Sequence, residues 1–244
     1  MVKNFILLII IFLFSFCTLQ NEKQNDNYLT KNEQKEGWSL LWDGKSFKGW
    51  RGINKDYFPT SGWIIENGEL ICIGSELPDS SRGGDIITTV KYDDFELKFD
   101  FKILENANSG IKYFVDESLS ESKYHGLGLE YAILDNNNWP YDKPEYNRTC
   151  GSLYDLVRSP DNANVNAYGE WNHGMIKVEK NHIHHWLNGV KTVDIIKNSK
   201  EYFDLVERSK YANIEKWGDF REGHILIQDE GPRTAFKNIK IKKL

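Results

Sequence analysis

The polar residues best placed to do chemistry form a turn near the C-terminus. Gln228, Asp229, Glu230 and Arg233 lie in this turn, between two apolar segments that alternate as strands do. Those strands can be buried without help from the turn, so its polar groups are free for another role. A sheet that ends in such a turn holds polar side chains on a rigid edge, where they can meet a ligand.

Two further carboxylates, Glu130 and Asp135, lie near the ends of an otherwise apolar segment. Residues an odd number apart point to opposite faces of a regular strand, so these two share a face only where a bulge or a strand end intervenes. The Glu-x-Asp-x-x-Glu motif of jelly-roll β-glucanases is absent, which disfavours an ordinary two-carboxylate glycosidase. Lys112 lies mid-strand among apolar residues, where it either reaches solvent or faces a polar cleft.

His182 and His184 alternate on a predicted strand and therefore share a face. Because the sequence shows no acidic ligand near them, we interpret them as surface residues and predict no metal site. Cys72 and Cys150 are far apart in the sequence, which favours buried free thiols over a disulfide. Nucleophile-elbow, phosphate-loop and dinucleotide-binding motifs are absent from the sequence.

The composition narrows the class of partner. The chain has 244 residues and a formal net charge of -5, without a basic stripe, so we predict no nucleic-acid partner. It contains 8 Trp, 12 Tyr and 13 Phe, more than a core of this size needs. Most of these aromatic residues are expected in the core, and a minority can stack on sugar rings.

The N-terminus predicts export. Lys3 followed by the apolar run Phe5 to Phe16 resembles a secretory signal, and Cys17 stands where a bacterial lipoprotein is cleaved and lipidated. We therefore divide the chain into a lipoprotein-type leader (1–17), a disordered tether (18–36) and one domain (37–244). This organisation predicts a lipid-anchored protein in the periplasm or on the outer membrane.

The domain itself is predicted to be all-β. Residues 95–103 alternate strictly between apolar and charged, as in an antiparallel strand with one buried face. Asn67-Gly68 and Asn188-Gly189 predict tight hairpin turns. Short strands at this spacing favour a two-sheet sandwich or a barrel, with one short helix at 199–206 and a long loop at 136–147.

Taken together, these motifs resemble the DUF1080 family, the 3-keto-disaccharide hydrolase or 3-keto-glucoside lyase/hydratase domain, over residues 37–244. Nine blocks match in order: Trp38-Ser-Leu-Leu-Trp-Asp-Gly-Lys, Gly83-Gly-Asp-Ile-Ile-Thr-Thr, Asp94-Phe-Glu-Leu, Asn108-Ser-Gly-Ile-Lys-Tyr-Phe, Leu129-Glu-Tyr-x-Ile-Leu-Asp, Asn147-Arg-Thr-x-Gly-Ser-Leu-Tyr-Asp, Gly169-Glu-Trp-Asn, His185-Trp-Leu-Asn-Gly-Val and Gln228-Asp-x-Gly. The resemblance implies a concanavalin A-like (jelly-roll) sandwich.

The resemblance also implies a particular chemistry. A ketone at C3 of a sugar acidifies the C2 proton, so a base can remove it and the C1 substituent then leaves by β-elimination. Water adds to the resulting 2-hydroxy-glucal, and the net reaction is hydrolysis. Such a site needs a base, an acid for the leaving oxygen and a donor near O3. We expect no cofactor, and a small carbohydrate as the substrate.

Site residues carry over from the resemblance by position. We assign Glu130 as base or substrate ligand, Lys112 as oxyanion donor, and Glu230 and Asp135 as further catalytic candidates. Sugar contacts are predicted from seven residues: Gln228, Asp229, Arg148, Tyr154, Tyr113, His125 and Trp139.

Three positions depart from the family pattern. Glu230 and Trp139 stand where the family usually has His, and Ala132 stands where it has Gln. Because a potential acid/base His is lost at two of these positions, a non-catalytic carbohydrate-binding module on the same fold is the alternative to an enzyme. A substitution of Glu130 by Gln would separate the two, since an enzyme would lose turnover and a binder at most affinity.

Overall fold

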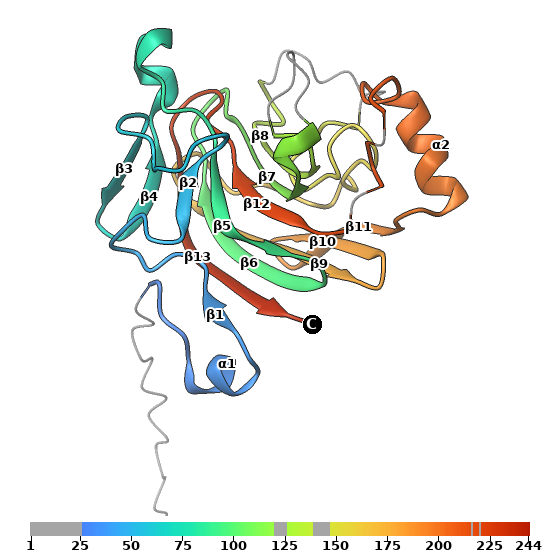
Figure 1. Cartoon of the computed structure of the whole chain (residues 1–244), viewed down its shortest axis with the longest axis horizontal. Helices are drawn as coiled ribbons and strands as arrows, with labels where there is room; N and C mark the ends of the chain where they lie inside the picture. Colours follow the sequence, from blue (N-terminus) through green and yellow to red (C-terminus); the bar gives the residue numbers. More distant parts are fainter. Residues whose placement is uncertain (1–25, 120–125, 139–146, 216, 220) are drawn as a thin grey trace, which may run out of the picture.

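The computed structural model describes residues 26–119, 126–138, 147–215, 217–219 and 221–244. Two antiparallel sheets pack face to face, and the two helices lie at the periphery (Figure 1). This confirms the predicted two-sheet sandwich. The predicted leader with Cys17, most of the predicted loop at 136–147, His125 and Trp139 lie outside the described residues.

The larger sheet has eight strands: seven follow the order β11-β10-β9-β6-β13-β4-β3, and β1 pairs with β13. The smaller sheet has five strands in the order β2-β5-β12-β7-β8. The larger sheet consists of β1 (Ser39–Leu40), β3 (Trp63–Glu66), β4 (Glu69–Cys72), β6 (Phe95–Lys102), β9 (Trp171–Glu179), β10 (His182–Leu187), β11 (Val190–Ile196) and β13 (Thr234–Lys243). The smaller sheet consists of β2 (Trp50–Gly52), β5 (Ile86–Tyr92), β7 (Asn108–Val115), β8 (Leu129–Leu134) and β12 (Gly223–Ile227). Three short 3-10 turns span Gly74–Glu76, Asp79–Ser81 and Glu117–Leu119.

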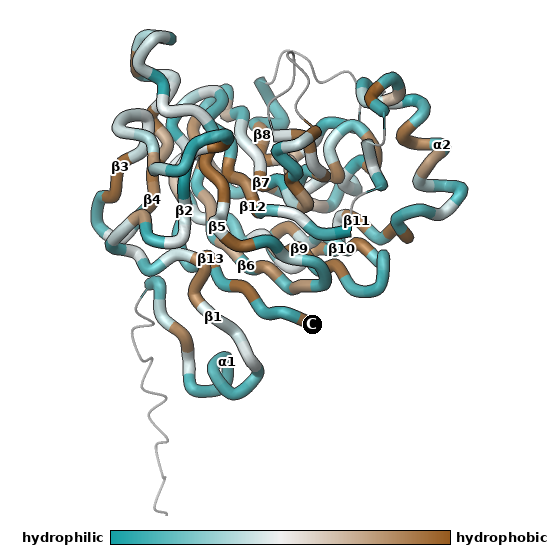
Figure 2. Tube along the Cα trace, in the orientation of Figure 1, coloured by the Kyte–Doolittle hydropathy of each residue, from teal (hydrophilic) through white to brown (hydrophobic). Residues whose placement is uncertain are grey.

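The core lies between the two sheets and is built from buried residues of both. Hydrophobic residues recur along the strands of the two layers (Figure 2). Strand β6 follows the predicted alternation, with every apolar side chain buried and every charged one partly exposed. Phe99 of β6 packs edge-on against Tyr131 of β8, with ring centroids 5.1 Å apart and an 89° angle between the planes. Such aromatic contacts across the layers fix the distance between the sheets.

The predicted hairpins form where the sequence places Asn-Gly pairs. Asn67 joins β3 to β4 and Asn188 joins β10 to β11, and both adopt positive φ angles, 51° and 49°. Asparagine tolerates this left-handed conformation, which the tight turn requires. Cys72 and Cys150 are free and buried, as predicted.

The helix prediction needs one correction. Helix α2 (Lys200–Arg208) matches the prediction and is capped by Ser199, but a second helix, α1 (Lys31–Lys35), lies inside the expected tether. Its physical cause is a capping box, in which the Thr30 side chain accepts from the Glu33 amide and the Glu33 carboxylate accepts from the Thr30 amide.

The segment that contains α1 is held against strand β13. Asn27 and Asn238 each donate a backbone amide hydrogen to the other's side-chain oxygen, at 2.6 and 2.9 Å. Lys240 forms an ion pair with Glu33 at 2.8 Å. The described part of the expected tether is therefore ordered and belongs to the sandwich. Within the described ranges, no helix has the length and apolar composition needed to cross a membrane.

The C-terminal turn has an unusual position, because β12 and β13 belong to different sheets. The chain must pass from one layer to the other between Ile227 and Thr234. Asp229 fixes this passage: its carboxylate accepts from the Gly84 amide of the smaller layer and from the Cys72 thiol of the larger one, both at 2.9 Å. The predicted polar turn therefore connects the edges of the two sheets and is held to both by hydrogen bonds.

Candidate active site

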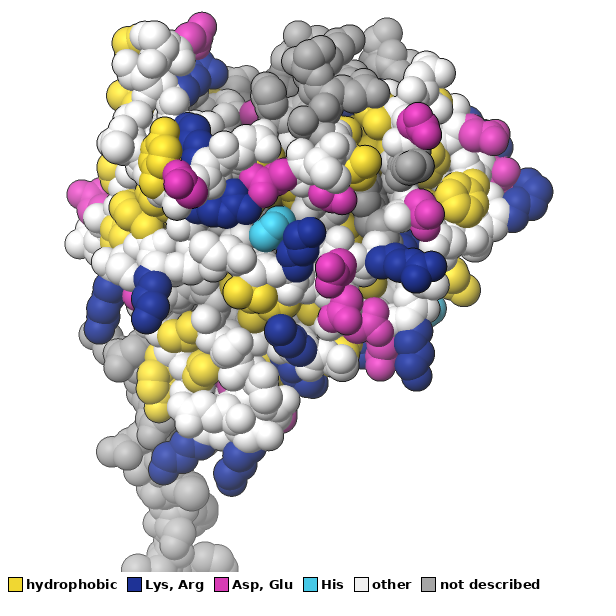
Figure 3. Space-filling view, viewed as in Figure 1, with side chains coloured by type: hydrophobic (Ala, Val, Ile, Leu, Met, Phe, Trp, Pro, Cys, Tyr) yellow, Lys and Arg dark blue, Asp and Glu magenta, His cyan; other side chains and the backbone are white. Residues whose placement is uncertain are grey.

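A polar cavity of about 200 Å³ opens on the outer face of the smaller sheet, at the ends of β7, β8 and β12. It brings together five of the predicted site residues: Lys112, Glu130, Tyr154, Gln228 and Glu230. Four residues that the sequence analysis did not assign also contribute side chains: Asn108, Leu127, Lys210 and Tyr211. Basic and acidic groups are likewise interspersed over the face of the molecule seen in Figure 3.

Glu130 and Lys112 face each other across neighbouring strands. They are directly paired in the register of β8 and β7, so their side chains leave the same face of the sheet side by side. Only 6% of Glu130 is exposed, and this burial raises the pKa of its carboxyl group to about 7. The positive charges of Lys112 and Lys210 oppose the shift without cancelling it.

Asp85 adds a second carboxyl group with a raised pKa. It precedes β5, and its Oδ1 accepts from the Asp229 amide at 2.8 Å, which ties it to the C-terminal turn. Burial raises the pKa of Asp85 to about 6, while the charge of Lys112 acts in the opposite direction. Asp85 does not line the cavity, but its charge acts on Glu130. Neighbouring carboxyl groups with raised pKa values are typical of acid/base chemistry.

Gln228 is placed by the backbone of β7. Its amide donates to the Gly110 carbonyl at 3.1 Å. Its side-chain Oε1 is buried and has no hydrogen-bond partner among the described residues. Gly110 leaves room for this arrangement, because a Cβ there would lie 2.4 Å from Gln228 Oε1 and 2.9 Å from Glu130 Oε1. A buried acceptor without a partner is suited to a hydroxyl group of a ligand.

Glu230 lies at the exposed rim of the cavity, where the family pattern has His. Its two carboxylate oxygens accept from Asn108 Nδ2 at 3.1 Å and from Gln228 Nε2 at 3.3 Å. These contacts turn the carboxyl group toward the cavity entrance. Ala132, the second departure, is buried in β8 beneath the loop at 149–152, whose Gly151 amide donates to its carbonyl.

Aromatic rings form one wall of the cavity. The Lys210 ammonium lies 4.5 Å from the ring centroid of Tyr154 and 5.0 Å from that of Tyr211. Burial lowers the pKa of Lys210, and the negative charge of Glu130 partly offsets this shift. Arg148 lies behind this wall: it contacts the Tyr154 ring at 5.3 Å and bonds Asp155 at 2.8 Å. Arg148 therefore positions Tyr154 and does not line the cavity.

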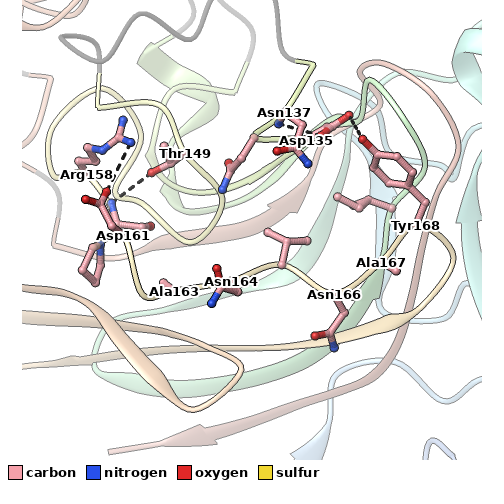
Figure 4. Close-up of a pocket in the computed structure, with 15 residues that line it drawn as sticks. Asp135, Asn137, Thr149, Arg158, Asp161, Ala163, Asn164, Asn166, Ala167 and Tyr168 are labelled. Atoms are coloured by element: carbon pink, nitrogen blue, oxygen red, sulfur yellow. Dashed lines mark hydrogen bonds and ion pairs between the residues drawn. The ribbon is translucent and has the colours of Figure 1, made fainter.

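Asp135 lies elsewhere, in a larger cavity of about 480 Å³ that Figure 4 shows. Burial alone would raise the pKa of Asp135, but hydrogen bonds from the Asn106 and Asn137 amides and from the Tyr168 hydroxyl outweigh it and keep the pKa low. A carboxylate held in this way organises its loop and is poorly suited to accept a proton. The carboxyl group with a raised pKa, Glu130, lines the smaller cavity, and Asp135 does not.

Two other predicted sugar contacts do not reach the cavity. Tyr113 is fully buried between the sheets, where its hydroxyl meets His185 Nε2 at 3.0 Å. Asp229 is turned toward Cys72 and Gly84, as described above, so it braces the site without entering it. His125 and Trp139 fall outside the described residues.

Comparison with known proteins identifies the family. Residues 37–242 match the model of the 3-keto-alpha-glucoside-1,2-lyase-like domain. The chain belongs to this family. A 3-keto-disaccharide hydrolase of Bacteroides thetaiotaomicron is 36% identical over 237 residues, which cover 86% of this chain and 79% of the relative.

Solved structures share the fold of this chain. A protein of Parabacteroides distasonis, provisionally named a glycosyl hydrolase, aligns with a TM-score of 0.79 and 32% identity, over 90% of this chain and 100% of the other. A second protein from the same organism, with the same provisional name, has a TM-score of 0.60 at 23% identity, over 80% and 99% of the two chains, and shows the shared fold. The predicted family and fold are therefore confirmed.

The buried Glu130 predicts a pH-dependent gain in stability on neutral substitution. Because folding raises the pKa of Glu130 to about 7, the protonated carboxyl group favours the folded state. This stabilisation is fully present below the pKa that Glu130 has in the unfolded chain, and it is lost as the pH rises through 7. Glu130→Gln should therefore change the free energy of unfolding little at about pH 4 and raise it by on the order of 1–3 kcal/mol at about pH 8.5. Urea denaturation at the two pH values measures this difference.

Glu76→Gln serves as the control. The hydrogen bond from Arg233 lowers the pKa of Glu76, so the ionised carboxylate stabilises the folded state. Glu76→Gln should therefore lower the free energy of unfolding, and only at pH values above the usual pKa of a carboxyl group. Equal effects of Glu130→Gln at both pH values would show that Glu130 is not held in a charge-disfavouring site.

Proposed function

We propose that the protein cleaves 3-keto-glucosides by elimination and hydration, with the small cavity as its active site. The observation that carries this proposal is the buried Glu130, with a pKa of about 7, paired across the sheet with Lys112. Membership of the lyase-like family and the relative's name, 3-keto-disaccharide hydrolase, support the substrate class.

The first step removes the C2 proton. At neutral pH a substantial fraction of Glu130 is ionised and can accept this proton, since a base works best when its pKa lies near the working pH. The electrons move toward the C3 carbonyl, and negative charge develops on O3. The ammonium groups of Lys112 and Lys210 face the same cavity and can stabilise that charge.

The second step expels the C1 substituent. The enolate re-forms the C3 ketone, a C1–C2 double bond forms, and the C1–O bond breaks while its oxygen takes a proton. Glu230, at the rim of the cavity, is the group we assign to donate it. Water then adds at C1 and a proton returns to C2, so the sum of the steps consumes one water and releases 3-keto-glucose and the aglycone.

The cavity also offers contacts for holding one sugar ring. Tyr154 and Tyr211 present aromatic surfaces, which pack against the C–H faces of sugars. Gln228 Oε1 is available to accept from a sugar hydroxyl. The volume of about 200 Å³ suits a single ring with the remainder of the substrate outside.

The decisive test compares Glu130→Gln with the unchanged protein on 3-keto-trehalose, a 3-keto-β-glucoside and their unoxidised parents. We expect the unchanged protein to release 3-keto-glucose that carries solvent deuterium at C2, and Glu130→Gln to lose at least about 100-fold in turnover. Proton NMR in D₂O follows both. The chain from residue 18 onward is suitable because it keeps α1 and its contacts with β13.

Glu69→Gln is the matched control, since Glu69 pairs with Lys102 on the other sheet, away from the cavity. Release of deuterated 3-keto-glucose by Glu130→Gln at an undiminished rate would remove Glu130 as the base. Saturable binding of the sugars with no turnover by any form would instead assign the protein as a carbohydrate-binding module.

Gly110 supplies an independent test of the cavity geometry. In Gly110→Ala the new methyl group meets Gln228 Oε1 and Glu130 Oε1, so both side chains must move. We expect turnover to fall by at least about tenfold, because small displacements of catalytic groups are costly. Urea denaturation checks that the variant is folded. Full activity in a folded variant would show that these two oxygens need not lie together over Gly110.

We also propose that the protein is exported and anchored through a lipid on Cys17, on the strength of the leader-like sequence before it. In a bacterial host that processes lipoproteins, Cys17→Ser should abolish metabolic labelling with an alkyne fatty acid and move the protein from the membrane to the soluble fraction. Unchanged membrane association without label would contradict the anchor.

A further inference from the structure

A second cluster of chemically capable side chains lies on the opposite layer from the cavity. His182 and His184 of β10 project from the outer face of the larger sheet, and Asp194 of β11 is directly paired with His184. One nitrogen from each histidine and one Asp194 oxygen lie within 4.8 Å of one another. The sequence analysis found no acidic ligand here, because the hairpin at Asn188-Gly189 brings Asp194 back from the next strand.

Asp194 Oδ1 lies near both imidazoles, and an ion between the three atoms would replace the hydrogen bond that joins His182 to Asp194. Asp194 Oδ1 lies 2.6 Å from His182 Nε2 and 3.6 Å from His184 Nδ1. His184 Nδ1 is buried and makes no hydrogen bond within the part of the chain that the structure describes. A buried imidazole nitrogen left unsatisfied calls for a partner, and a metal ion supplies one.

We propose that His182 Nε2, His184 Nδ1 and Asp194 Oδ1 bind a divalent transition-metal ion of the Zn²⁺ class. Two imidazoles and one carboxylate form a ligand set that Zn²⁺ accepts in tetrahedral coordination, with the fourth position open to water. Because β10 and β11 form the edge of the larger sheet, the ion would fasten the last hairpin of that sheet. This role is separate from the proposed catalysis on the other layer.

Neighbouring charges leave the ligand atoms available. Lys191 holds the other oxygen of Asp194, Oδ2, at 2.7 Å, so Oδ1 remains directed at the histidines. Lys177 lines a groove on this face together with His182 and His184, and it pairs with Glu96 and Glu179 at 3.3 and 3.1 Å.

The experiment titrates Zn²⁺ into the full chain, purified in detergent without a histidine tag and freed of metal with a chelator. Isothermal titration calorimetry should give one ion per chain with a dissociation constant in the micromolar range. Co²⁺ in place of Zn²⁺ should give the visible absorption of a tetrahedral site. His184→Ala and Asp194→Asn should each weaken binding by at least about tenfold.

His173→Ala is the matched control. His173 lies on the same outer face and also bonds a carboxylate, Asp100, at 2.6 Å, but among the described residues it belongs to no cluster of three ligands. Its substitution should leave the affinity unchanged, and the free thiols of Cys72 and Cys150 are buried away from solvent. Absence of Zn²⁺ binding, or equal weakening by His173→Ala and His184→Ala, would overturn the proposal and leave a hydrogen-bonded surface cluster.

Discussion

The passage of the chain from β12 to β13 is the constraint on which the candidate site depends. The two strands belong to different sheets, so the turn between them would move with every change in the spacing of the layers. Asp229 prevents this by accepting from Gly84 on one side and Cys72 on the other. Its own amide holds Asp85. Gln228 and Glu230, on either side of Asp229, are therefore fixed relative to Glu130 and Lys112, which the register of β7 and β8 places.

The rest of the site follows from the cost of burying charge. The outer face of the smaller sheet is covered by loops, so a carboxylate on it loses water and its pKa rises unless partners compensate. Asp135, at the far end of β8, is compensated fully by loop amides and Tyr168 and keeps a low pKa. Glu130, at the near end, is compensated only in part by two lysines, and its pKa remains at about 7. The same strand thus carries one carboxylate that organises a loop and one that can exchange a proton near neutral pH.

Much of this architecture could be predicted from the sequence, because alternation and Asn-Gly turns are local signals. Strand β6, the hairpins at Asn67 and Asn188, and helix α2 all follow from them. Helix α1 was missed because it has no buried residue and depends on a capping box of two side chains. Lys210 and Tyr211 could not be found, since they come from an irregular segment after α2 that reaches the cavity only through the tertiary fold. Asp194 was missed for the corresponding reason: a cross-strand neighbour is invisible until the register is known.

Glu230, at the position where the family pattern has His, changes the charge of the cavity in the proposed reaction. Glu130 and Glu230 line the cavity together with the ammonium groups of Lys112 and Lys210, and Asp85, bonded to the Asp229 amide, lies close enough for its charge to act on Glu130. Burial raises the pKa values of Glu130 and Asp85, and the charge of Lys112 only partly offsets it, so the site favours keeping a proton on one of these carboxyl groups. When Glu130 acts as the base, a proton retained on Asp85 keeps the site closer to neutrality. Glu230, held at the rim of the cavity by Asn108 and Gln228, is the group proposed to protonate the departing oxygen.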